Sequence, residues 1–179
     1  MTGPADLQRF AVKIFAERRA PLEVSEFIPV FHRWIRDRAV PGILIDVADY
    51  GHLPEGPGVM LVGHEADYAM DAMEGPFGLL YTRKRPSPGA LAGRLEAALR
   101  AAQAAGAKLE EEFAGRLVIG KGEALFLSND RLLAPNDGAA FEALRPALES
   151  AASAVFGGAD VRREEGDPRR RLAVRLTCR

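Results

Sequence analysis

The chain has 179 residues, a formal net charge of −1, 47% hydrophobic side chains and 27% charged ones, which is the balance of an ordinary soluble globular protein. Its near-neutral charge excludes the overall field that attracts nucleic acid or an anionic membrane surface. The single cysteine, Cys178, excludes an internal disulfide and a zinc site made of several cysteines. No apolar run approaches the ~18 residues that cross a bilayer, and no secretory signal pattern opens the sequence. We therefore expect a cytoplasmic protein with no membrane partner.

The N-terminal segment is predicted to contain one ambiguous element and one helix. Residues 7–16 fit both the alternation of a strand and the spacing of a helix, and both interpretations stay open. A helix is predicted to begin with Ser25 as its N-cap and to end at Pro41-Gly42. Its buried stripe, at spacing i, i+3, i+4 and i+7, consists of Phe27, Val30, Phe31 and Trp34.

Two apolar runs, residues 42–50 and 59–65, flank a connection rich in Gly and Pro at residues 51–58. The first run is apolar on both faces, which is typical of a central strand, or of a strand covered on one side and flanked by a partner chain. The short connection predicts that the two runs pair antiparallel. Residues 67–76 are predicted to be irregular, and residues 77–84 to form a further strand.

The next segment is predicted to be a long helix followed by a strand pair. Ser87-Pro88 is a favoured helix start, and Gly115 is predicted to cap the end of this helix. Residues 117–119 and 124–127 are predicted to form a hairpin that turns at Gly120-Lys121-Gly122.

The C-terminal segment is predicted to be a helix and a hairpin. Asn136 or Asp137 caps the helix, and Pro146 is expected to kink it or to divide it in two. Residues 160–165 and 171–178 are predicted to form the last hairpin, with Cys178 buried on its apolar face.

These elements predict an α+β fold, with a mainly antiparallel (mixed) sheet and about three helices packed on one face. We expect one α+β domain over residues 1–179, which could be divided near residue 86 into two parts, 1–85 and 86–179, that share one core.

A polar cluster follows the two apolar runs, and it is where we expect a site. The predicted pairing places Asp46 roughly opposite Val62 and His64 roughly opposite Leu44, so that the charged ends share one rim of the sheet. His64, Glu65 and Asp46 are therefore candidate acid–base residues, and His64 and Glu65 candidate metal ligands. A zincin motif is incomplete, because Tyr68 stands where its second His belongs. The competing interpretation is a solvated strand end, and no cofactor is expected.

Other candidates for ligand binding surround this cluster or lie in the loop after residue 127. They are Asp49, Asp67, Tyr68, Asn129 and Arg131. The segment from Gly115 to Gly122 has the spacing of a phosphate-binding loop, but the apolar residues inside it predict a strand, so nucleotide binding is rejected. Seven arginines between residues 160 and 179 are interspersed with acids and have no aromatics among them, which favours an ordinary solvated face over nucleic-acid binding.

Three short segments carry a resemblance to known sequences. They are residues 42–50, residues 63–68 and the run Asn129-Asp130-Arg131-Leu132. In these segments the chain resembles a group of uncharacterised bacterial proteins of similar length. That group has no known function, so the resemblance implies no activity and no site.

We expect the protein to be a non-catalytic binding or accessory module that acts through self-association or a protein partner. The reasons are the absence of a complete catalytic motif, the near-neutral charge, and apolar strands that need cover. The alternative is a small metal-dependent or acid–base enzyme that uses the polar cluster from Asp46 to Asp71.

Overall fold

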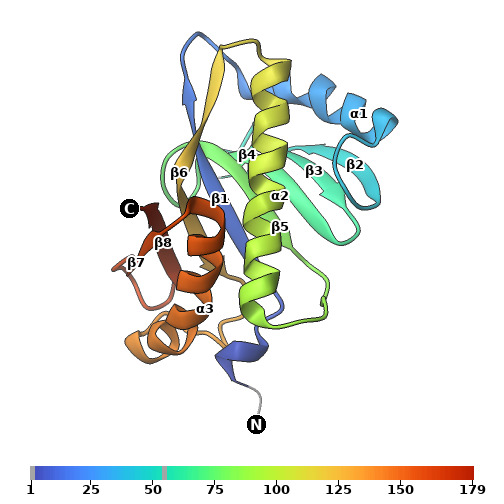
Figure 1. Ribbon diagram of the computed structural model, residues 1–179. Helices are drawn as coiled ribbons and strands as arrows, with labels where there is room; N and C mark the ends of the chain where they lie inside the picture. Colours follow the sequence, from blue (N-terminus) through green and yellow to red (C-terminus); the bar gives the residue numbers. More distant parts are fainter. Residues whose placement is uncertain (1–2, 54–55) are drawn as a thin grey trace.

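The computed structural model describes residues 3–53 and 56–179, so Pro54 and Glu55 of the predicted 51–58 connection lie outside the described residues. It contains one eight-stranded sheet in the order β2-β3-β4-β5-β1-β6-β8-β7, with antiparallel pairing between all neighbours. Three helices cover one face of this sheet (Figure 1). The α+β fold with a mainly antiparallel sheet is thereby confirmed.

The strands and helices have the following bounds. The strands are β1 Phe10–Arg18, β2 Leu44–Asp49, β3 Val59–Gly63, β4 Ala66–Asp71, β5 Gly78–Arg83, β6 Leu117–Ser128, β7 Ala159–Arg163 and β8 Ala173–Cys178. The helices are α1 Phe27–Asp37, α2 Leu91–Glu112 and α3 Gly138–Phe156. Of the helices in the described part of the chain, none has the length and apolarity that a membrane span requires.

The ambiguous N-terminal element is a strand, β1, and it lies in the middle of the sheet between β5 and β6. Its side chains alternate between the two faces of the sheet, as a strand requires. Phe10, Val12 and Ile14 join the core beneath the helices, whereas Ala11 and Phe15 belong to a small cluster on the other face.

The predicted helices exist, but all four boundaries of the first two were wrong. The N-cap of α1 is Glu26 rather than Ser25, and α2 ends at Glu112 with Phe113 rather than Gly115 as its C-cap. The α1 helix begins at Phe27 and ends at Asp37, because Arg38 adopts a left-handed conformation (φ 50°), well before Pro41. The α2 helix begins at Leu91 rather than at Ser87, with Ala90 as its N-cap.

The third helix confirms the predicted cap and excludes one of the two alternatives at Pro146, the division into two helices. The Asp137 side chain accepts a hydrogen bond of 2.8 Å from the Ala140 N–H, as an N-cap does. Pro146 lies inside one continuous helix, α3, rather than between two helices.

Two strand predictions were wrong, and one of the two alternatives for residues 42–50 is excluded. The segment predicted to be irregular contains β4, a strand between β3 and β5. The predicted hairpin around Gly120 is one strand, β6, which stays paired with β1 on both sides of a bulge: Ile14 lies opposite Ala124, and Ala16 opposite Ile119. The β2 strand is at the edge of the sheet rather than at its centre.

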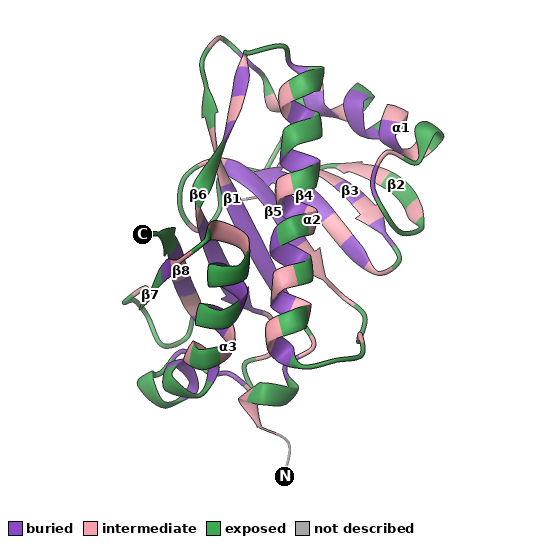
Figure 2. Cartoon of the chain, in the orientation of Figure 1, coloured by how far each residue is buried: buried purple, intermediate pink, exposed green. Residues whose placement is uncertain are grey.

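The two faces of the sheet are unlike, and Figure 2 shows that the central strands β1 and β5 consist mainly of buried residues. The helix-covered face holds the main core, to which all three helices and the buried α1 residues Phe27, Val30, Phe31 and Trp34 contribute. The helix-free face has a smaller cluster of buried residues, composed of Ala11, Ala69, Leu80, Leu125 and Leu127. Cys178, predicted to be buried, is exposed at the end of β8.

Candidate functional site

The predicted rim at the end of β3 is a tight turn in which the side chains of His64 and Glu65 lie within hydrogen-bond distance of each other. The His64 Nδ1 lies 3.2 Å from a Glu65 carboxylate oxygen, and the other Glu65 oxygen accepts a hydrogen bond of 3.2 Å from the Ile43 N–H. These contacts, the Ile43 N–H first, lower the pKa of the Glu65 carboxyl. Leu44 pairs with Gly63 rather than with His64, so the register differs from the expected one by one residue at this end.

Asp46 lies opposite Val62, as predicted, but it does not join the His64–Glu65 pair. Its carboxylate accepts a hydrogen bond of 2.8 Å from the Val47 N–H. No hydrogen bond or ion pair of the described residues connects it to His64 or Glu65. The described chain also contains no group of three or more His, Cys, Asp or Glu residues that could hold a metal ion.

The remaining candidates near β2 to β4 have structural contacts. Asp49 accepts a hydrogen bond from the Gly51 N–H (2.8 Å), and Asp67 accepts one from the Gly63 N–H (3.0 Å). Tyr68 is buried in the core with its ring edge-on to that of Tyr81, at a centroid distance of 5.2 Å. Burial, with a smaller effect of Tyr81, raises the pKa of Tyr68, so this phenol stays neutral at physiological pH.

A buried ion pair that sequence reasoning missed lies on the helix-free face. The Lys13 ammonium is 2.6 Å from an Asp71 oxygen and 2.5 Å from the Met73 carbonyl oxygen, and the two side chains are 0% and 2% exposed. Burial raises the pKa of the Asp71 carboxyl, and Lys13 offsets this effect only in part. Lys13 of β1 thus binds both the end of β4, through Asp71, and the start of the β4–β5 connection, through Met73. These two contacts fix the connection against the central strand.

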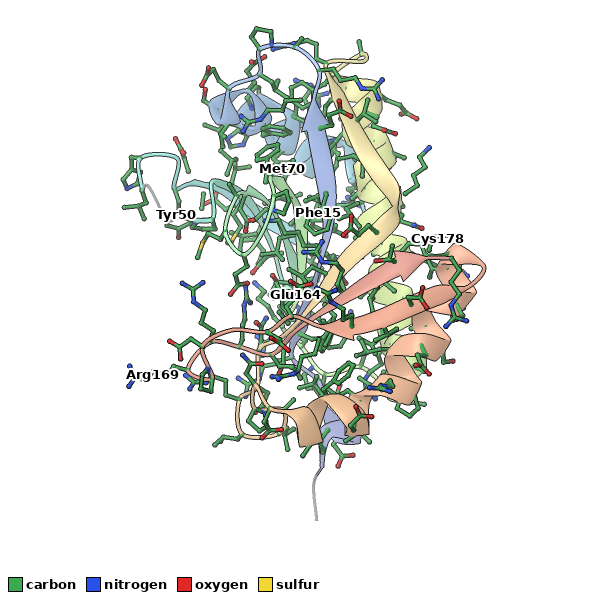
Figure 3. The ribbon with its side chains drawn as sticks, turned by 90° about the vertical axis from the view of Figure 1, so that its left-hand side faces the viewer. Phe15, Tyr50, Met70, Glu164, Arg169 and Cys178 are labelled. Carbon is green, nitrogen blue, oxygen red and sulfur yellow. The ribbon has the colours of Figure 1, made fainter. Side chains whose placement is uncertain are left out.

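A second ion pair joins the β4–β5 connection to the segment that precedes β8. Arg171, before β8, donates hydrogen bonds to the Glu74 carboxylate in the β4–β5 connection and to the Asn129 side-chain oxygen (2.5 Å). The candidate Asn129 is thus part of this bridge, whereas Arg131 is exposed in the loop after β6. Figure 3 shows the connections that carry Tyr50 and Arg169 projecting on the side of the sheet opposite to α2.

A groove of about 280 Å³ lies beside this bridge, with Leu125 and Ala173 among its apolar residues. Its charged lining is mixed, and consists of Glu74, Glu164, Glu165, Asp167, Arg170, Arg171 and Arg175. Several of these charges neutralise one another, because Arg171 pairs with Glu74 and Arg175 with Glu164. With four carboxylates and three arginines in its lining, the groove has an excess of only one negative charge.

Exposed apolar side chains gather at the β2 edge, with Ile45 on the strand and Ile43 directly before it. Ile43 is 62% exposed and Ile45 is 57% exposed. Tyr50 and Leu53, just after β2, are exposed as well. Ile45 lies where the β2–β3 register shifts, between the pairs Leu44–Gly63 and Asp46–Val62. An exposed edge strand with large apolar side chains is a template for pairing with another chain.

Comparison of the chain with protein-family models, with curated proteins and with solved structures found no match.

Proposed function

We propose that this protein is a non-catalytic binding module that acts through protein association, and that its docking element is the edge strand β2. The observation that carries the proposal is the exposure of Ile43 and Ile45 at an edge of the sheet. Burying an exposed Ile side chain contributes about 1.5–3 kcal/mol, which gives this edge a driving force for association.

The backbone of β2 supports pairing on its outer side. Hydrogen bonds from the Tyr50 N–H to Gly58 and from the His64 N–H to the Ile43 carbonyl mark the bonded pairs at the two ends of the β2–β3 ladder. Because bonded and non-bonded pairs alternate in an antiparallel ladder, the N–H and C=O groups of Val47 and Asp49 point away from β3. They are the groups that an added strand would use.

A second copy of the chain is the partner that fits this edge. An antiparallel edge strand can pair with its own copy about a twofold axis, which gives a closed dimer. The other edge of the sheet, β7, carries exposed Asp160 and Arg162, charges that protect an edge strand from pairing.

Two carboxylates make this association weak. Asp46 and Asp49 are exposed on β2, and in a dimer they would lie near the same residues of the second copy. Asp46 also occupies the Val47 N–H, which an added strand would need. We therefore expect a reversible dimer that strengthens with salt, because salt screens like charges.

Light scattering on the full chain over a wide range of concentration tests the proposal. The wild-type protein should dimerise, more strongly at high salt. Ile45→Lys should weaken the dimer more than tenfold, since the loss of about 1.5–3 kcal/mol per copy exceeds the ~1.4 kcal/mol that tenfold requires. Asp46→Asn should strengthen it.

Leu132→Lys is the matched control, because Leu132 is 96% exposed in the loop after β6 and belongs to no edge strand. This variant should dimerise as the wild type does. A wild-type protein that stays monomeric at every concentration and salt level, or an Ile45→Lys variant that dimerises normally, would refute the proposal.

A further inference from the structure

A cavity of about 220 Å³ lies between β5 and the first turns of α2, apart from the β2 edge. Its walls come from both elements and from the connection between them. They are Tyr81, Arg83, Ser87, Pro88, Gly89, Ala90, Gly93, Arg94, Ala97 and Ala98. The hollow exists because the α2 residues that face it are small.

The charge in this cavity has one sign. Arg83 and Arg94 line it, and no Asp or Glu is among its lining residues. The groove on the helix-free face differs, since carboxylates there accompany the arginines. A cavity with two guanidinium groups and no carboxylate attracts an anion.

The start of α2 adds unsatisfied donors. Its N-cap, Ala90, has no side chain that could accept a hydrogen bond, and the first turn contains no acidic residue. The first intrahelical bond with Ala90 runs from the Arg94 N–H, 3.1 Å from the Ala90 carbonyl, so the N–H groups of residues 91–93 have no acceptor within the helix. Such an N-terminus attracts negative charge through these N–H groups and the helix dipole.

Tyr81 is an independent indication that the cavity binds a ligand. Its side chain is 6% exposed and lines the cavity from β5, on the side of the sheet that faces the helices. Among the described residues, no side-chain hydrogen bond involves its hydroxyl. The hydroxyl is not enclosed by protein atoms, so it is open to the cavity, where a ligand oxygen can accept a hydrogen bond from it.

Arg94 is a fixed positive charge in the wall of the cavity. Its guanidinium donates hydrogen bonds to the carbonyls of Leu7 (2.9 Å), Ala5 (3.3 Å) and Gly89. These bonds connect the N-terminal segment to the start of α2, which are neighbours in Figure 1. A fixed positive charge loses little conformational freedom on binding.

We propose that this cavity binds a phosphate group, either inorganic phosphate or the phosphate of a small monoester. The Gly93 N–H, Arg83 and the Ser87 hydroxyl, all of residues that line the cavity, would surround the phosphate oxygens, and the Tyr81 hydroxyl would donate to one of them. The volume lies below the about 300–1,000 Å³ of cavities that bury drug-sized ligands, which selects a small ligand over a nucleotide.

Gly93 offers a test that separates binding from folding. A side chain at this position would meet nothing within 4 Å, and both Glu and Gln favour a helix over Gly. Gly93→Glu places a carboxylate at the cavity, whereas Gly93→Gln adds the same bulk without charge. Both variants should melt at or above the wild-type temperature.

Calorimetric titration of the full chain with inorganic phosphate and with glycerol phosphate gives the affinity. Gly93→Gln controls for the added bulk: Gly93→Glu should bind at least about tenfold more weakly than Gly93→Gln, and Arg83→Gln at least about tenfold more weakly than the wild type, which is ~1.4 kcal/mol. Binding should strengthen as the pH rises past about 6, where phosphate becomes a dianion.

The two titrants identify the ligand. Equal affinities assign the site to the phosphate group alone, and a tighter glycerol phosphate complex assigns it to small monoesters. Arg131→Gln, in an exposed loop, should bind as the wild type does. No binding of either titrant by the wild type, or undiminished binding by Gly93→Glu, would overturn the proposal.

Discussion

Replacing Asp71 by valine would leave the Lys13 ammonium buried with one neutral acceptor, the Met73 carbonyl. Both side chains of the ion pair are enclosed, at 0% and 2% exposure, so water cannot replace the lost carboxylate. Removing one partner of a buried ion pair typically costs about 3–5 kcal/mol. For a chain of this length, 1 kcal/mol shifts the melting temperature by about 2–4 °C, so we expect a loss of roughly 6–20 °C.

Urea unfolding followed by circular dichroism measures the free energy of unfolding of the wild type, Asp71→Val, Lys13→Met and the double variant. The double variant removes both charges, and buried pairs are often replaced by apolar residues of similar volume without loss. It should therefore be far more stable than the sum of the two single losses predicts. The reasoning fails if Asp71→Val loses less than about 1 kcal/mol, or if the two losses are simply additive.

The Lys13→Met variant also has a predicted pH dependence. The pKa of Asp71 is raised in the folded protein, so its contribution to stability is present below the unfolded pKa of about 3.9 and is lost as the pH rises through the folded value. Removing the Lys13 ammonium raises the folded pKa further. The deficit of Lys13→Met relative to the wild type should thus be smaller near about pH 5 than near about pH 7, and an equal deficit at both values would contradict this account.

Two further substitutions test local features of the fold by the same unfolding assay. Gly78→Ala would place a methyl group 2.2 Å from the Ile14 carbonyl oxygen and 3.0 Å from the Phe15 Cα; because both are backbone atoms of the central strand, we expect a loss of about 3 kcal/mol, and a neutral effect would show that β1 and β5 can separate at little cost. Asp137→Ala removes the side chain that caps α3 and should cost about 1 kcal/mol, whereas Asp137→Asn should lose less than half of that.

The sequence patterns predicted correctly those elements whose decisive contacts join residues close together in the chain. The stripe of α1 is buried because residues three and four apart lie on one side of a helix. The β7–β8 hairpin forms around its short polar connection, and Leu172, Val174 and Leu176 face the core as their alternation predicts. Asp137 caps α3 through a contact within its own first turn.

The incorrect predictions came from residues whose partners are distant in sequence. Residues 67–76 were predicted to be irregular because Gly75-Pro76 interrupts them, but their first part is the strand β4, in which Lys13 of the central strand compensates the charge of Asp71. The Gly120-Lys121-Gly122 run resembles a hairpin turn, yet β1 pairs with the strand on both sides of it. The signal for a buried ion pair was Lys13 itself, because its neighbours on the same face of the strand, Ala11 and Phe15, are apolar and leave a charge there without solvent.

The position of β1 also explains why the candidate rim did not assemble as expected. The apolar run at residues 42–50 suggested a central strand, but β1 takes the centre and leaves β2 at the edge. Asp46 then binds its own backbone instead of meeting His64. The division into residues 1–85 and 86–179 stays a prediction.

The central strand β1 precedes the other seven strands of its sheet in the chain, so it leaves the ribosome before them, and this order has a kinetic consequence. In β1, Phe10 pairs with Arg83 of β5 on one side and with Ser128 of β6 on the other. The strands β2 to β5, in contrast, can each pair with the strand that precedes them in the sequence. During synthesis, an apolar strand with two vacant sides must wait until most of the chain has emerged. Such long-range pairing slows folding and prolongs the exposure of aggregation-prone surface, so the nascent chain rather than the finished fold is the stage at which a chaperone would matter most.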